Sequence, residues 1–229
     1  MSITTHWAAR SLTYGQSGPP LNPNQEIIDG FTSLVPTSGH ILLLGVTAKI
    51  HAAYTHITAV DYSPAMIERV WPGNTPTKQV QEGNWLTVDL PVGTFDAILG
   101  DGSVNMLAYP VEVKKLFARS LTWLKPGGVF ACRMYTRPDV RISRADLIRE
   151  GITPTVNWSA YRRMLSMHLA DQYGQTIETR LITDLFNDLF PDRGILPWTQ
   201  EQLEMIDTYA KSTMRSCLPT RKELEQIFP

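Results

Sequence analysis

Short apolar runs alternate with amphipathic segments along the first 135 residues of the chain. The runs that are long enough for strands cover 40–45, 57–61, 77–82, 95–100 and 127–134. Segments with helical spacing separate them, at 48–54, 64–70, 104–108 and 110–124. Continuous apolar strands are typical of a sheet covered by helices on both faces, and helical crossovers make neighbouring strands parallel. The pattern predicts an α/β fold with a doubly wound, mainly parallel sheet.

The pattern becomes helical after residue 135. Ser143, Thr199 and Thr220 each precede a helical segment and each has an acidic or amide residue three positions later, as in a capping box. Apolar residues recur at helical spacing over 157–173 and over 176–190. We therefore expect a helical C-terminal appendage, with a strand inside 176–183 as the alternative for that stretch.

These changes of pattern divide the chain into three parts. Residues 1–23 hold a short helix at 6–10 and a loop rich in Gly and Pro, and we expect this part to act as an N-terminal lid. Residues 24–135 form the α/β domain, whose first helix is expected to start at Asn22-Pro23 and to run to Leu34. Residues 136–229 form the helical appendage, which we expect to pack on the same domain.

The charge of the chain gives no sign of a polyanionic or membrane partner. Lys plus Arg number 21 and Asp plus Glu number 22, so the net charge of the 229 residues is −1. This balance argues against nucleic-acid binding and against a polybasic membrane contact, and it favours a small-molecule substrate. The chain has no secretory signal pattern and no apolar run of membrane length, which predicts a soluble, cytoplasmic protein. Its two cysteines and five histidines lack metal-ligand spacing, so we expect no metal.

Candidate binding residues follow the ends of the predicted strands, where open α/β sheets bind ligands. Gly45 ends the first strand, and its loop has too few glycines for the pyrophosphate cradle of a dinucleotide site. Asp61 ends the second strand, where an acidic residue can accept hydrogen bonds from both ribose hydroxyls. The alternative is that Asp61 caps the next helix, but Ser63 and Pro64 already supply a cap and a first helical residue.

Two further strand ends carry polar groups. Asn84 and Trp85 follow the third run, and a side-chain amide there can pair with the edge of an adenine base. Asp101, Gly102 and Ser103 follow the fourth run and lie at the same edge of the predicted sheet. We expect these strand ends to share one binding site.

Taken in order, five segments resemble the class I S-adenosylmethionine-dependent methyltransferases. They are LLLGVTAKI, AVDYSPAMIERV, EGNW, FDAILGDGSVNML and LKPGGVFACR, and the resemblance covers about 38–135. It implies a Rossmann-like methyltransferase fold and S-adenosylmethionine as the cofactor, with S-adenosylhomocysteine as the product. It also implies methyl transfer, and with the charge balance it points to a small-molecule acceptor.

The resemblance assigns cofactor contacts position by position. Those to the methionine half and the methyl group fall on Gly45, Val46, Thr47, Asp101, Gly102 and Ser103. Those to the ribose and adenine fall on Asp61, Tyr62, Met66, Asn84 and Trp85.

The chain also departs from the family pattern. The family's first loop is acid-x-Gly-x-Gly-x-Gly, whereas this chain lacks the acid and the second and third glycines between Leu43 and Lys49. Asn84 stands where the family usually has Asp, although an amide oxygen still accepts a hydrogen bond. The family's sixth strand and antiparallel seventh strand are not evident after residue 135.

Methyl transfer is an in-line displacement that depends mainly on positioning, so no catalytic triad is expected. If the acceptor must lose a proton, Asp101, Tyr14 and His6 are the candidate catalytic bases. Trp7, Tyr14, Tyr135, Trp158 and Tyr161 are candidates for the wall of the acceptor pocket, against the alternative that they serve ordinary packing.

Two other functions stay open at this stage. One is a non-catalytic subunit that binds S-adenosylmethionine or a partner, which the altered first loop suggests. The other is a nicotinamide-dependent oxidoreductase, which the single glycine and Asn84-Trp85 disfavour. A homodimer is also left open.

Overall fold

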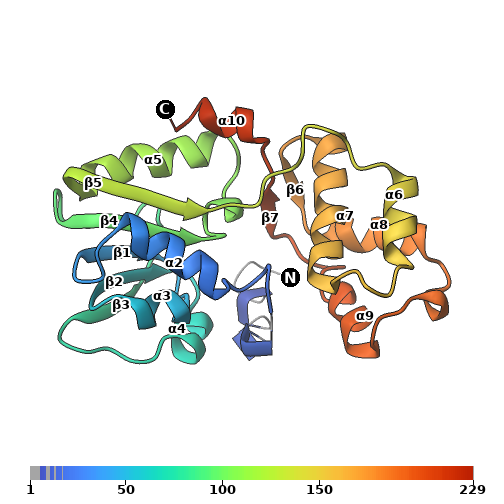
Figure 1. Ribbon diagram of the computed structural model, residues 1–229, viewed down its shortest axis with the longest axis horizontal. Helices are drawn as coiled ribbons and strands as arrows, with labels where there is room; N and C mark the ends of the chain where they lie inside the picture. Colours follow the sequence, from blue (N-terminus) through green and yellow to red (C-terminus); the bar gives the residue numbers. More distant parts are fainter. Residues whose placement is uncertain (1–5, 9–10, 13, 17, 229) are drawn as a thin grey trace. The chain divides into compact units, whose positions relative to one another are not determined.

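The structure is a computed structural model that describes residues 6–8, 11–12, 14–16 and 18–228. The described residues fall into two compact units. The α/β unit takes in the described residues up to Val104 together with Pro110–Met134. The helical unit takes in Asn105–Tyr109 and the chain from Tyr135 onward. Figure 1 labels the elements of each unit.

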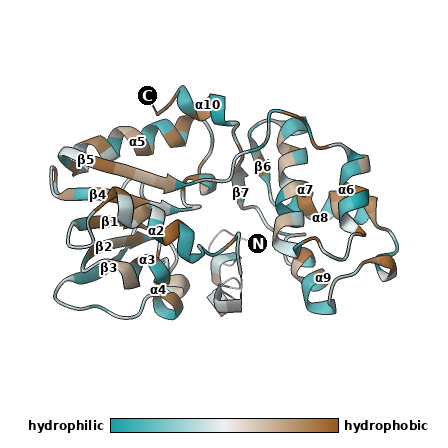
Figure 2. Cartoon of the chain, viewed as in Figure 1, coloured by the Kyte–Doolittle hydropathy of each residue, from teal (hydrophilic) through white to brown (hydrophobic). Residues whose placement is uncertain are grey.

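The α/β unit is built on one five-stranded sheet. Its strands are β1 (His40–Leu44), β2 (His56–Asp61), β3 (Lys78–Glu82), β4 (Phe95–Asp101) and β5 (Leu124–Arg133). They lie in the order β3-β2-β1-β4-β5, and every neighbouring pair is parallel. The predicted doubly wound parallel sheet is therefore confirmed. Figure 2 shows the apolar character of β1, β2 and β5.

Helices and two short 3₁₀ turns accompany the sheet in the described residues up to Trp123. The α-helices are α2 (Gln25–Leu34), α3 (Ala48–Ala53), α4 (Pro64–Val70) and α5 (Val111–Trp123), and the turns are η1 (Tyr14–Gln16) and η2 (Val104–Met106). Ser63 caps α4 as expected, accepting the Met66 N–H at 3.3 Å. The cap of α2 is Asn24, and the predicted start at Asn22 is wrong. Asn22 instead donates to the Tyr14 carbonyl, which holds it in the preceding loop.

One face of the sheet packs against α2, α3 and α4. Buried residues at alternate strand positions, among them Leu43, Ala59 and Leu99, form a cluster with Phe31 of α2 and Ile50 of α3. Alternation follows from the pleat, which turns successive side chains to opposite faces. A continuous apolar strand therefore supplies both faces of this sheet at once.

The opposite face of the sheet packs against α5. Phe117 of α5 and Phe130 of β5 meet edge to face, with ring centroids 5.8 Å apart. Val113 and Leu116 of the same helix are buried. The sheet is thus covered on both sides, and its carboxyl edge remains as the place for a ligand.

The helical unit has a core of its own. Its helices are α6 (Arg144–Gly151), α7 (Trp158–Tyr173), α8 (Arg180–Leu189), α9 (Gln200–Asp207) and α10 (Arg221–Glu225), with a 3₁₀ turn, η3 (Arg193–Ile195). The three predicted capping boxes at Ser143, Thr199 and Thr220 all form, with both reciprocal hydrogen bonds. The core cluster centres on α7 and α8 and includes Leu165 and Phe186, both without exposed surface.

A small antiparallel sheet lies in the helical unit, and one of its two strands falls in the stretch 176–190, where the spacing predicted helix. It pairs β6 (Thr176–Glu178) with β7 (Arg215–Cys217). Ile177 is buried in β6, and it would also fit the apolar face of the predicted helix. A single apolar residue therefore does not distinguish the two patterns. The alternative of a strand inside 176–183 is the correct one.

The close packing of the helical unit leads to a stability prediction. A Cβ on Gly151 would lie 2.4 Å from Cζ of Phe190 and 3.0 Å from the Tyr161 hydroxyl, both of which are buried. Gly151→Ala should therefore lower the free energy of unfolding by about 1–3 kcal/mol. Gly30→Ala in α2 is the control, because a Cβ there meets nothing within 4 Å and should raise stability by about 0.5–1 kcal/mol. Urea denaturation measures both, and a Gly151→Ala protein as stable as the parent would contradict the packing described.

Candidate functional site

A row of residues crosses the carboxyl edge of the five-stranded sheet at one register level. Leu44 pairs with Val60 and with Gly100, and the Gly45 N–H continues the ladder to the Val60 carbonyl at 2.8 Å. From β3 to β5 the row reads Glu82, Asp61, Gly45, Asp101 and Arg133. Residues at one level of a parallel sheet point to the same face, so these groups gather around Gly45.

Gly45 keeps space open in the middle of the row. Its φ of +100° is in a region that residues with a side chain rarely adopt. A Cβ at this position would lie 3.6 Å from Oδ2 of Asp61 and 4.0 Å from Oγ of Ser103. Ser103 Oγ in turn donates to the Leu44 carbonyl at 2.5 Å, which ties the loop after β4 to the end of β1. A ligand at Gly45 can therefore approach the backbone and the Asp61 carboxylate together.

Asp61 has one carboxylate oxygen in use and one available. Oδ1 accepts the Ser63 N–H at 2.8 Å, whereas Oδ2 has no hydrogen-bond partner among the described residues. Burial raises the pKa of Asp61 to about 6, although the Ser63 N–H opposes the shift. Asp61 is half-buried, so its Oδ2 can be reached by a ligand, and two ribose hydroxyls would give the carboxylate charge-assisted hydrogen bonds. Asp61 therefore fits the predicted ribose contact.

Trp85 and Asn84 lie at the end of β3, beside Asp61. The Trp85 indole donates from Nε1 to the Val60 carbonyl at 2.7 Å, which fixes the ring next to the end of β2. Asn84 is exposed, and its Oδ1 accepts the Leu86 N–H at 2.9 Å. An amide oxygen has two lone pairs, so one remains for an adenine amino group. The adenine contact of Asn84 stays a prediction.

Tyr62 and Met66 follow the end of β2 along the chain. The Tyr62 side chain is 47% exposed and can cover a base, whereas Met66 is buried in the core beneath α4. In the loop after β1, Val46 and Thr47 are both buried. Thr47 occupies the N-cap position of α3, yet its hydroxyl makes no cap hydrogen bond. Its predicted contact with the methionine half stays a prediction.

Asp101 and Arg133 form an ion pair at the ends of β4 and β5, between Asp101 Oδ1 and Arg133 Nε. The two side chains are only 3% and 16% exposed. Burial raises the pKa of Asp101, while the hydrogen bond and charge of Arg133 oppose the rise. The backbone of Gly102, with φ +69°, donates to the Arg133 carbonyl at 2.9 Å. Protonation of Asp101 would break up this pair, so we do not carry Asp101 forward as a catalytic base.

The N-terminal segment packs on the α/β unit, although residues 1–5, 9–10, 13 and 17 of the predicted lid lie outside the described residues. Trp7 and Tyr14 are half-buried against the cluster of α2, α3 and α4. His6 is 6% exposed and meets the Trp7 ring edge to face, which leaves little surface for a base. The following loop is fastened by Lys49, whose Nζ donates to the Pro23 carbonyl at 2.8 Å.

Trp158 and Tyr161 belong to the core of the helical unit. They are 5% and 0% exposed, and the Tyr161 hydroxyl donates to the Leu147 carbonyl at 3.1 Å. Their rings each lie 4.7 Å from the Trp198 ring. Their prediction as acceptor-pocket residues does not agree with this burial, because the helical spacing that singled them out also describes a buried helix face. Ordinary packing, the alternative given above, fits them better.

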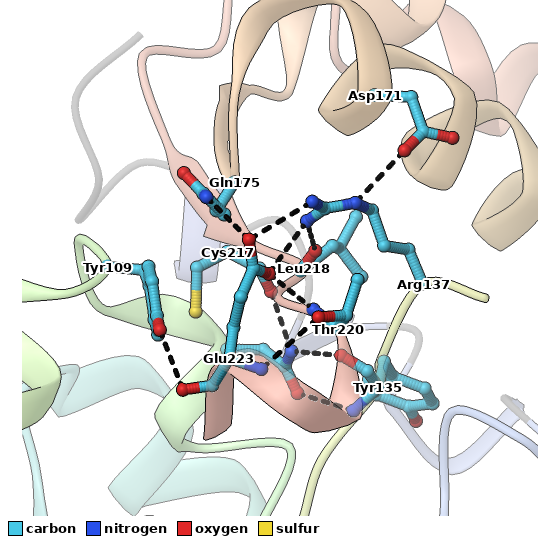
Figure 3. A network of polar contacts seen from close by, with 10 residues as sticks. Tyr109, Tyr135, Arg137, Asp171, Gln175, Cys217, Leu218, Thr220 and Glu223 are labelled. Atoms are coloured by element: carbon cyan, nitrogen blue, oxygen red, sulfur yellow. Dashed lines mark hydrogen bonds and ion pairs between the residues drawn. The ribbon is translucent and has the colours of Figure 1, made fainter. Parts of the chain in front are cut away.

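Tyr135 is held in a polar network of the helical unit (Figure 3). Its backbone N–H donates to Oδ1 of the buried Asn105, and its carbonyl accepts from Nδ2 at 2.9 Å. The same Nδ2 donates to the Cys217 carbonyl at 2.7 Å. The Arg163 guanidinium lies 4.0 Å from the centre of the Tyr135 ring. Asn105 thus joins the segment after β5 to β7, a contact that no sequence pattern indicated.

Arg137 and Glu223 form the second half of the network in Figure 3. Arg137 pairs with Asp171 at 3.0 Å and with Glu223 at 3.2 Å. Burial opposes the ionisation of Glu223, but hydrogen bonds from Gln175, Thr220 and Arg137 outweigh it and hold the pKa of Glu223 below its ordinary value. The network fastens α10 to α7, so its role is structural.

Comparisons with known proteins agree with this geometry. Residues 43–132 match the family model of the methyltransferase domain. No curated protein matches the chain. A structure from Rhodobacter sphaeroides described as "Putative Zn-dependent Alcohol Dehydrogenases" is 14% identical, with a TM-score of 0.61. It covers 98% of this chain and 85% of that chain, and at this identity the likeness concerns the fold alone.

Two methyltransferase structures match a smaller share of the chain. The CcbJ methyltransferase from Streptomyces caelestis is 18% identical with a TM-score of 0.48, and CalS10 from Micromonospora echinaspora, an amino pentose methyltransferase, is 23% identical with a TM-score of 0.42. They cover 58% and 52% of this chain. This chain spans 62% and 52% of theirs, less than two thirds of either.

The parallel sheet and its strand order agree with the match of residues 43–132 to the methyltransferase domain. Over these residues the chain is similar to the methyltransferase domain, and the match covers less than half of the chain. The described residues contain no group of three His, Cys, Asp or Glu side chains that could hold a metal ion. They also contain no helix that is both long and apolar enough to cross a membrane.

The raised pKa of Asp61 leads to a pH prediction. Hydrogen bonds to the ribose need the ionised carboxylate, so affinity for S-adenosylhomocysteine should be constant well above pH 6 and should fall as the pH drops through about 6. At pH 5 we expect a loss of roughly ten-fold, because one proton then competes with the ligand. Calorimetry from pH 5 to pH 8 measures it.

Asp61→Asn is the matched control for this titration. It should bind roughly ten-fold more weakly than the parent at pH 8, because a charged acceptor becomes neutral. Its affinity should not change between pH 8 and pH 5. A parent affinity that is flat over the same range would show that Asp61 does not contact the ligand.

Proposed function

We propose that this protein transfers a methyl group from S-adenosylmethionine to a small-molecule acceptor. The observation that carries the proposal is the Asp61 carboxylate, which has a free Oδ2 and lies against the open space at Gly45.

Asp61 then holds the ribose, while Trp85 and Tyr62 lie beside the adenine and Asn84 accepts a hydrogen bond from its amino group. The methionine half lies along Gly45, Val46 and Thr47, with Gly102 and Ser103 near the methyl group.

The cofactor, when bound, supplies a methyl group on a positively charged sulfur. The acceptor's lone pair forms the new bond to the methyl carbon while the carbon–sulfur bond breaks, and the sulfur keeps the bonding electrons. The protein's part is to align the acceptor with the methyl carbon and to exclude water. In well-aligned cases such positioning can lower the activation barrier by about 7 kcal/mol or more. No side chain needs to act as a nucleophile in this reaction.

We place the acceptor site next to the N-terminal segment. Trp7 and Tyr14 pack on the same face of the sheet to which Asp61 and Gly45 belong. Tyr14 is the remaining candidate for a base, because His6 is buried and Asp101 is paired. The net charge of −1 supports a small acceptor over a polyanion. We also propose a cytoplasmic location, and the oligomeric state stays open.

Two alternatives are separated by one set of measurements. A non-catalytic subunit would bind S-adenosylhomocysteine without methyl transfer to any acceptor in a panel of hydroxyl, amine, thiol and carbon acids. A nicotinamide-dependent oxidoreductase would bind NAD in preference, although the first loop provides no glycine-rich cradle for a pyrophosphate. Thermal shifts with each ligand and a labelled-methyl assay with the purified chain distinguish the three functions. Stabilisation by NAD and not by S-adenosylhomocysteine would contradict the proposal.

Removal of the N-terminal segment tests the lid. Deletion of residues 1–20 should lower turnover by at least about ten-fold, because the acceptor loses the wall that positions it. The affinity for S-adenosylhomocysteine should fall much less, since the row at the carboxyl edge remains. Turnover and calorimetric affinity are measured on the same preparation.

A substitution pair controls for general loosening of the segment. Tyr14→Ala removes a half-buried ring on the core, whereas Leu12→Ala changes a side chain that is 64% exposed in the same segment. We expect Tyr14→Ala to lower kcat/KM for the acceptor and Leu12→Ala to leave it unchanged. Full turnover by the deletion variant would show that the segment is no lid.

A further inference from the structure

The loop after β4 leads from the row at the carboxyl edge directly into the helical unit. The proposed function puts Gly102 and Ser103 of this loop near the methyl group, and Asn105 is where the chain enters the helical unit. Ser103 is anchored to the end of β1 through the Leu44 carbonyl. Only Val104 lies between Ser103 and Asn105, and Asn105 has no exposed surface. Whatever fixes Asn105 therefore also limits where the loop can lie.

The Asn105 amide uses both of its donors and one of its acceptor sites. Nδ2 donates to the Tyr135 carbonyl at 2.9 Å and to the Cys217 carbonyl at 2.7 Å, while Oδ1 accepts the Tyr135 N–H at 2.9 Å. Figure 3 labels Tyr135 and Cys217 in this network. Two carbonyls need donors and one N–H needs an acceptor, so a single orientation of the amide satisfies all three groups.

The bonds with Tyr135 continue the connection between the chain after β4 and the chain after β5. Within the row, Asp101 pairs with Arg133, and the Gly102 N–H donates to the Arg133 carbonyl at 2.9 Å. Beyond the row, the Asn105 amide meets both the N–H and the C=O of Tyr135, as a residue of a hydrogen-bonded strand pair does. Asn105 thus keeps the two chain segments in step after the ladder has ended.

We propose that Asn105 is a positioning residue for methyl transfer, which holds Gly102 and Ser103 in place through its bonds to Tyr135 and Cys217. The inference rests on the proposed function. A buried amide whose hydrogen bonds are all made specifies one arrangement of its neighbours. Alignment matters for the rate, because a displacement of about 1 Å that starts far from the chemistry can cost about a hundred-fold.

The alternative is that Asn105 only stabilises the helical unit. Its loss would then lower the stability of the protein and leave the turnover of the folded protein unchanged. If Asn105 positions the loop, turnover falls in a protein that is folded and still binds S-adenosylhomocysteine. The affinity should persist because the ribose contact is assigned to Asp61, which makes no bond to this loop.

Thr183 provides the matched control within the same unit. Its side chain is 3% exposed, and its hydroxyl donates to the Ile206 carbonyl at 2.7 Å, which joins α8 to α9. Thr183→Val removes this bond and keeps the size of the side chain. It should destabilise the helical unit without changing kcat, because the bond that it removes does not hold the loop after β4.

Two substitutions at Asn105 should give graded losses of kcat. Asn105→Ala removes all three bonds and should lower kcat by roughly ten- to a hundred-fold, with less than about a three-fold change in the Kd of S-adenosylhomocysteine. Burial favours the protonated form of an aspartic acid, which keeps the acceptor and one donor. Asn105→Asp should therefore recover part of the loss. Turnover and calorimetric affinity are measured on the full chain, together with the urea denaturation of each variant.

Hydrogen exchange gives a readout that does not depend on activity. Asn105→Ala should speed the exchange of the backbone amides over 102–106 by at least about ten-fold, because the loop loses one of its two anchors. Thr183→Val should speed exchange in α8 and α9 and leave 102–106 unchanged. Unchanged exchange over 102–106 in Asn105→Ala would overturn the inference.

The remaining outcomes separate the inference from the proposed function. If Asn105→Ala turns over as fast as the parent, or if Thr183→Val loses as much kcat at equal stability, the inference is overturned while the proposed function stands. If neither Asn105 variant folds under conditions in which Thr183→Val does, Asn105 is a stability residue and the inference is overturned as well. If the parent neither binds S-adenosylhomocysteine nor transfers a methyl group, the proposed function fails and the inference fails with it.

Discussion

The site depends on one constraint, the reversal of strand order between β1 and β4. The chain adds β2 and β3 on one side of β1 and then crosses to add β4 and β5 on the other. The connections after β1 and β4 therefore leave in opposite directions at the carboxyl edge, which is where open α/β sheets bind ligands. Gly45 lies at this point, and the Ser103–Leu44 hydrogen bond holds the two strand ends together beneath it. The carboxylates of Asp61 and Asp101 flank it because they share its register level.

Much of this arrangement could be predicted from the sequence because it follows from short-range rules. Apolar runs broken by helical spacing specify parallel strands with crossovers, and the ligand site then lies at the strand ends. Asp61 could be singled out because Ser63 and Pro64 already supply the cap and first residue of α4, so the Asp61 side chain is not needed as the helix cap. The capping boxes at Ser143 and Thr199 were equally predictable, since each needs only two residues three positions apart.

Contacts between distant segments could not be predicted in this way. The pairing of Asp101 with Arg133 depends on the register of β4 against β5, which no single-strand pattern contains. Asn105 donates to the carbonyl of Cys217, 112 residues further along the chain, and nothing near Asn105 indicates this partner. Trp158 shows a different limit: it is buried in the core of the helical unit, and the sequence pattern of an apolar helix face is the same for a core residue and for a pocket residue.

The central claim is that Asp61 and Gly45 form the ribose site of S-adenosylmethionine. A crystal structure of the protein with S-adenosylhomocysteine tests it most directly. We predict both ribose hydroxyls within hydrogen-bond distance of the Asp61 carboxylate, with the ligand chain passing over Gly45. A ribose bound elsewhere, with Asp61 still bonded only to the Ser63 N–H, would contradict the claim.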